Sequence, residues 1–105
     1  MTYNYFPGRL RFRDPVLRDT DIRSAALEVV RLICPQAEIT YKESTASILA
    51  IYPEAAVDPE ALKPLVPLLL KLEPKIRFYT PKKKADILAG IAEIKAQIEK
   101  MGEIK

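Results

Sequence analysis

The residues of this 105-residue chain that could do chemistry are mostly cations. Arginines stand at the alternate positions Arg9, Arg11 and Arg13, and three lysines follow one another at 82–84. The chain has no histidine, the side chain that most often serves as a general base near neutral pH. The three glycines stand apart, so no glycine-rich phosphate loop is present. We therefore expect no catalytic residues and no cofactor. The net charge of +3 is compatible with an anionic partner.

Ligands for a metal ion are sparse. Cys34 is the only thiol, so the chain can form no internal disulfide and no pair of thiolates for a soft cation. We interpret Cys34 as a small core residue. A hard metal held by Asp14, Asp19 and Asp21 is an alternative, but helix capping explains these aspartates better. We therefore predict no metal site.

The sequence around these residues predicts an alternation of strands and helices. Period-two alternation indicates a strand over 5–13, with an irregular start at Pro7 and Gly8. A helix from about residue 19 to Pro35 precedes a hairpin of strands over 37–42 and 46–52. A helix bent by internal prolines is expected over 58–74, then a fourth strand over 75–79 and a last helix over 80–101.

This order, βαββαβ followed by a helix, predicts an α+β fold of the ferredoxin-like type with an extra C-terminal helix. We assign residues 1–80 to the sandwich and residues 81–105 to an amphipathic helical extension. Both sandwich helices should cover one face of a four-stranded antiparallel sheet. No apolar stretch is long enough for a transmembrane segment. No secretory leader follows Met1, so we expect a cytoplasmic protein.

The other face of the predicted sheet is left bare. In the expected strand order, the outward residues are Arg77 and Tyr79, then Arg9, Arg11 and Arg13, then Leu49 and Ile51, then Thr40 and Lys42. The two large aliphatic side chains on such a face favour a cover or a partner. This face is one candidate interaction surface.

The last helix provides a second candidate interaction surface. Ile87, Ile91, Ile94 and Ile98 recur at spacings of 4, 3 and 4, which is typical of a coiled-coil seam. The seam either packs on its own domain or pairs with a copy of the chain or another protein. Lys82, Lys83 and Lys84 lie in the first turn, where cations oppose the helix dipole. They are either anion contacts or solvated side chains.

Two motifs give the chain a resemblance to a known family. The segment Phe6-Pro-Gly-Arg-Leu-Arg-Phe-Arg13 and the segment Thr45-Ala-Ser-Ile-Leu-Ala-Ile-Tyr-Pro53 resemble the heavy-metal-associated (HMA-like) domain family. The resemblance is to its divergent branch, which lacks the Cys-x-x-Cys metal site, and it extends over about residues 6–79. It implies the ferredoxin-like fold and a loose link to metal homeostasis, because such domains accompany metal-transporting ATPases. The loop at 14–19, where the family's metal binders carry their thiols, has none here.

Two functional hypotheses follow. The first is a non-catalytic protein-interaction module that self-associates as a homodimer or binds another protein. The alternative is an anion or nucleic-acid binder that uses the arginine-rich open sheet face. RNA-binding sandwiches use this face through stacked aromatic residues on the central strands, where the present chain has arginines and aliphatic residues.

Overall fold

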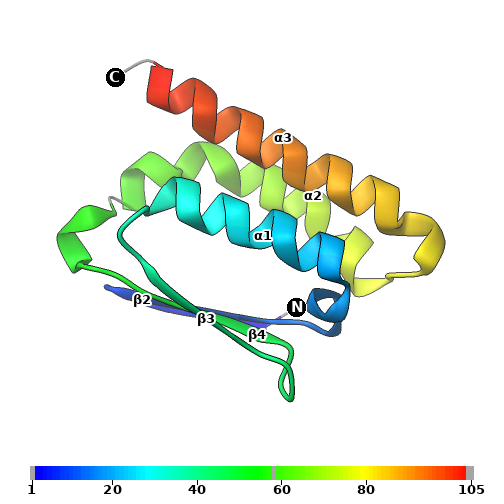
Figure 1. Cartoon of the computed structure of the whole chain (residues 1–105). Helices are drawn as coiled ribbons and strands as arrows, with labels where there is room; N and C mark the ends of the chain where they lie inside the picture. Colours follow the sequence, from blue (N-terminus) through cyan, green and yellow to red (C-terminus); the bar gives the residue numbers. More distant parts are fainter. Residues whose placement is uncertain (1, 58, 104–105) are drawn as a thin grey trace.

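The computed structural model describes residues 2–57 and 59–103, which form an α+β fold. Within these residues the strands are β1 (Thr2–Phe6), β2 (Arg9–Arg13), β3 (Glu38–Lys42) and β4 (Ser47–Ile51). The α-helices are α1 (Thr20–Ile33), α2 (Val66–Arg77) and α3 (Lys84–Glu103). Short 3-10 turns are η1 (Pro15–Arg18), η2 (Glu54–Ala56), η3 (Pro59–Leu65) and η4 (Pro81–Lys83). In Figure 1 the helices lie on one side of the sheet.

The strands form one antiparallel sheet in the order β1-β2-β4-β3. The turn Pro7-Gly8 joins β1 to β2, and Gly8 has a φ of +86°. Glycine takes this left-handed conformation without strain, and a Cβ at Gly8 would lie 3.0 Å from the carbonyl oxygen of Tyr52. The tight turn therefore makes residues 2–6 an edge strand, where only an irregular strand start was expected.

The fourth strand predicted over 75–79 is wrong, because α2 extends through Arg77. Leu72 and Ile76 are one helical turn apart and both are buried in the core between the helices. Pro74 lies inside α2, where a proline typically costs ~3 kcal/mol. Burying two such side chains contributes about 1.5–3 kcal/mol each, enough to offset that cost. The α+β class is confirmed, but the βαββαβ order is not, since β1 occupies the edge position expected for residues 75–79.

The main hydrophobic core lies between the helices. Its buried residues are Val16, Ile22, Leu65, Leu72, Ile76, Ile87, Ile91 and Ile94. A Cβ added to Gly90 would lie 2.7 Å from Cδ1 of Leu72, so α2 and α3 approach closely at this point. The buried residues come from η1, α1, η3, α2 and α3. One continuous core therefore joins helices that are far apart in the sequence.

The isoleucine seam of α3 packs on its own chain. Ile87, Ile91 and Ile94 are buried in this core, and Ile98 packs against it partly exposed. Helix α3 contacts both α1 and α2, as Figure 1 shows. The expectation that these isoleucines offer an interaction surface is therefore corrected, since their side chains are already covered. The residues expected as an extension complete the core, and 104–105 lie outside the described residues.

The helix-facing side of the sheet carries a second group of apolar side chains. Ile48 and Ala50 of β4 are buried, and their partners on β2 are Phe12 and Leu10. On β3, Tyr41 lies under α1, and Arg23 of α1 stacks over its ring at 4.3 Å. The contact between Arg23 and Tyr41 joins α1 to the sheet.

The packing of α2 on α3 predicts different costs for two neighbouring leucines of α2. Leu72 is 6% exposed and Leu70 is 63% exposed. Leu72→Ala should lower the free energy of unfolding by about 2–5 kcal/mol, because it leaves a cavity opposite Gly90. Leu70→Ala, the matched control, should change it by no more than about 0.5 kcal/mol. Urea denaturation measures both, and equal losses would contradict the assignment of Leu72 to the core.

Candidate functional site

The face of the sheet that points away from the helices, called the outer face below, is the main candidate site. Its residues follow from the strand register, because residues directly opposite in antiparallel strands project from the same face. The described residues of the outer face are Asn4 and Phe6 of β1, Arg9, Arg11 and Arg13 of β2, Ser47, Leu49 and Ile51 of β4, and Glu38, Thr40 and Lys42 of β3.

Most residues predicted for this face lie on it. Arg11 pairs with Leu49, which pairs with Thr40, and the rows on either side contain Ile51 and Lys42. Ile51 is 49% exposed and Leu49 is half-buried. The alternation along each strand was therefore sufficient to assign these side chains to a face.

Arg77 and Tyr79 do not lie on the outer face, which corrects the prediction for both. Arg77 is in α2 and donates a hydrogen bond to Glu73, with 3.0 Å between Nη2 and Oε1. Tyr79 follows α2 and packs, partly buried, against the core between the helices. The physical reason is the continuation of α2 through residues that were expected to form a strand.

The charge of the outer face is strongly positive. Among its described residues are the cations Arg9, Arg11, Arg13 and Lys42 and a single carboxylate, Glu38. No ion pair within the described residues involves any of these four cations. Among the described residues, the outer face therefore carries more positive than negative charge, and none of its four cations is ion-paired.

Cations elsewhere in the chain are often paired with carboxylates. Lys71 lies 4.0 Å from Glu93, and Lys95 lies 3.1 Å from Glu28. Such exposed pairs contribute little to stability, typically below about 1 kcal/mol each. They do neutralise the surface of the helical layer locally. Arg31, Lys82 and Lys100 are also unpaired among the described residues, so the distinguishing feature of the outer face is that its unpaired arginines lie in one row along β2.

Two residues of the outer face were not predicted from the sequence. Phe6 is 60% exposed and lies opposite Arg9, and Asn4 lies opposite Arg11. These four residues line a hollow on the outer face. The signal that could have found them is the Pro7-Gly8 pair between two alternating segments, which is typical of a hairpin.

The lysine run at 82–84 is mostly engaged within the chain. Lys84 Nζ lies 2.8 Å from Asp21 Oδ2 and 3.1 Å from Asp19 Oδ2. Lys83 Nζ donates to the carbonyl oxygen of Phe78 at 3.1 Å and lies 6.0 Å from the centre of its ring. The prediction of an anion contact is corrected for Lys84, whose charge ties the start of α3 to the start of α1. Lys82 is exposed.

Of the three aspartates considered as metal ligands, Asp14 and Asp19 act as caps, and Asp21 pairs with Lys84. Oδ1 of Asp14 accepts a hydrogen bond from Val16 N at 2.9 Å. Oδ1 of Asp19 accepts from Asp21 N and Ile22 N at 3.0 and 3.2 Å. Within the described residues, no group of three or more cysteine, aspartate or glutamate side chains is placed to hold a metal ion.

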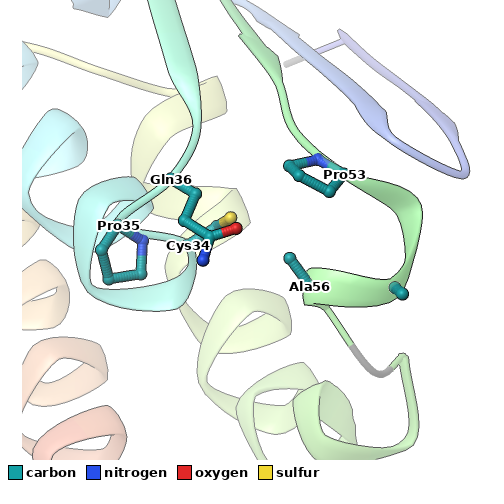
Figure 2. Close-up of a pocket in the computed structure, with 6 residues that line it drawn as sticks. Cys34, Pro35, Gln36, Pro53 and Ala56 are labelled. Carbon is teal, nitrogen blue, oxygen red and sulfur yellow. The ribbon is translucent and has the colours of Figure 1, made fainter.

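A second hollow, of about 410 Å³, lies where α1 ends. Figure 2 shows Cys34, Pro35 and Gln36 on one side of it and Pro53 and Ala56 on the other. Cys34 is 3% exposed, as expected of a core residue. The described residues of the lining include no charged side chain, so they offer a ligand little beyond the Gln36 amide and backbone groups.

Comparisons with protein-family models, curated proteins and solved structures found no match to this chain. The resemblance to heavy-metal-associated domains therefore stays a prediction. In the described residues, no helix is both long and apolar enough to cross a membrane.

The Asp19–Lys84 pair predicts a pH dependence of stability. The backbone N–H of Ile22 and, after it, the Lys84 ammonium hold the pKa of Asp19 below its ordinary value of 3.8. Because folding lowers this pKa, ionised Asp19 stabilises the fold above 3.8, and the contribution is lost as the pH falls through the folded pKa. Asp19→Asn, which keeps an acceptor for the cap, should therefore lower the Tm at pH 7, with a difference from wild type that shrinks below pH 3.8.

Asp86→Asn is the control for this experiment. Asp86 is an exposed aspartate in the first turn of α3, and its carboxylate makes no ion pair within the described residues. Its replacement should leave the Tm close to that of the wild type over the same pH range. Differential scanning fluorimetry measures both variants, and a difference for Asp19→Asn that persists unchanged in acid would contradict the account.

Proposed function

We propose that the chain is a non-catalytic binding module whose outer face binds an anionic macromolecule. The observation that supports this most strongly is the row formed by Arg9, Arg11 and Arg13, with Lys42 on the flank, none of them ion-paired within the described residues. A polyanion that lies along β2 would neutralise these charges and release its counterions, which favours association at low ionic strength.

The shape of the surface supports the same proposal. Arg9 and Arg13 are exposed, and Arg11 is half-buried beside Leu49. Arginine stems can pack along such apolar side chains while their guanidinium groups stay in contact with solvent. Planar guanidinium groups hold carboxylate, sulfate or phosphate oxygens through paired hydrogen bonds. The outer face thus combines guanidinium donors with the apolar side chains of Leu49 and Ile51.

Self-association through the outer face is less well supported. Two copies placed face to face would bring two arginine rows together, and like charges at an interface are unfavourable. The isoleucine seam of α3, the other surface expected to pair with a copy, is covered by α1 and α2. Of the two hypotheses drawn from the sequence, the anion binder is therefore the one that we propose.

Replacement of the arginine row tests the proposal. The variant Arg9→Gln/Arg11→Gln/Arg13→Gln should bind a fluorescent heparin oligosaccharide at least about tenfold more weakly than the wild type at about 0.1 M salt, because the sugar sulfates lose their partners. Fluorescence anisotropy measures the Kd, and circular dichroism checks that the variant is folded.

A second triple variant controls for net charge. Arg31→Gln/Lys82→Gln/Lys100→Gln removes the same charge from exposed residues outside the outer face that form no ion pair within the described residues. Its affinity should stay within about twofold of the wild type, since long-range charge alone contributes little once salt screens it. Equal losses in the two triple variants, or no binding by the wild type at any salt concentration, would refute the proposal.

A further inference from the structure

We infer that the anionic ligand of the outer face is single-stranded nucleic acid, with a base stacked on Phe6 and the adjacent phosphates held by Arg9 and Arg11. This inference rests on the proposed function and narrows it to one ligand class. It depends on the juxtaposition of an exposed aromatic ring and two arginines across the β1–β2 pair.

The placement of Phe6 is the first argument. Phe6 lies directly opposite Arg9 in the β1–β2 register, at a site where opposing Cβ atoms are typically about 4.5–5.5 Å apart. The residue is 60% exposed on the outer face, and no ring contact within the described residues involves it. A large apolar ring in this position has a free π face beside a cation, which is the arrangement that holds an unpaired base.

Phe78 provides an internal comparison. It is also strongly exposed, but it lies at the end of α2, with Lys83 hydrogen-bonded to its carbonyl oxygen and positioned over its ring. Exposure alone therefore does not distinguish Phe6. The distinguishing feature is its location on the cationic outer face, where it forms one hollow with Asn4, Arg9 and Arg11.

The spacing of the cations is the second argument. Arg9, Arg11 and Arg13 occupy alternate positions of an extended strand, so their Cα atoms repeat at roughly 6.8 Å along a line. A linear row of this kind suits a polymer with one negative charge per repeat unit. Asn4, opposite Arg11, adds an amide that can donate to and accept from a base edge. The hollow thus offers a ring for base stacking, two cations for phosphates and one amide that can hydrogen-bond to a base edge.

The choice of a single strand follows from geometry. In a duplex the bases are stacked on one another and present only their edges, so a ring on a sheet surface reaches a base face only at the cost of unstacking a base step. An acidic peptide would satisfy the arginines but has no planar ring in each repeat unit to stack on Phe6. Unpaired nucleotides supply both the charge and the ring.

The experiment compares two oligodeoxynucleotides of equal length, about ten nucleotides, one of mixed sequence and one abasic throughout. Both present the same phosphates, but only the first has bases. The wild type should bind the mixed-sequence strand at least about fivefold more tightly, because stacking on one aromatic ring contributes about that factor or more. With three phosphates neutralised, the logarithm of the affinity should fall with the logarithm of salt concentration at a slope of about −2 for both strands.

Substitution of Phe6 separates stacking from apolar contact. Phe6→Leu keeps an apolar side chain without a π face and should abolish the preference for the mixed-sequence strand. Phe78→Leu, the same change at the other exposed phenylalanine, should leave the preference unchanged. Because the chain contains no tryptophan, Phe6→Trp introduces a unique fluorophore, whose emission should be quenched by the mixed-sequence strand and not by the abasic one.

The outcomes of these experiments distinguish this inference from the proposed function on which it rests. Equal affinity for the two strands, or a preference that survives Phe6→Leu, would overturn the inference. If heparin binding still depended on the arginine row, the proposed function would stand. A wild type that binds neither strand nor heparin would overturn both.

Discussion

Burial of the isoleucine seam of α3 against α1 and α2 is the contact on which the other surfaces of this protein depend. Ile87, Ile91 and Ile94 complete a core between the helices, so α3 needs no partner to cover its apolar face. The helices lie together on one side of the sheet. In the described part of the chain, no helix lies over the other side, and the outer face is left to solvent or to a ligand.

The distribution of charge follows the same division into layers. Carboxylates on the helices neutralise several helical cations, and Lys84 joins α3 to the cap of α1 through Asp19 and Asp21. Glu38 is the one carboxylate among the described residues of the outer face. Because exposed ion pairs add little to stability, unpaired arginines there cost the fold little. Their concentration on one strand supports the proposed binding function, for which unneutralised donors are an advantage.

Local patterns in the sequence predicted local structure well. Alternation assigned Arg11 and Leu49 to one face, and the 4-3-4 spacing of isoleucines identified the buried stripe of α3. The errors arose where tertiary contacts override a local signal. Pro74 suggested the end of a helix, but burial of Ile76 against the other helices extends α2 beyond it. The edge strand beside β2 was predicted at residues 75–79, whereas β1 occupies that position. Phe6, at the end of β1, was therefore not predicted as a residue of the candidate site.

The most direct test of the central claim is a map of the binding surface by NMR. Backbone amide shifts of the ¹⁵N-labelled protein would be followed during titration with a ten-nucleotide single strand. The account predicts that the perturbed amides cluster in β1, β2 and β4, around Phe6, Arg9, Arg11 and Leu49, while those of α3 stay unchanged. Perturbations centred on the helices, or none at a strand concentration well above that of the protein, would contradict it.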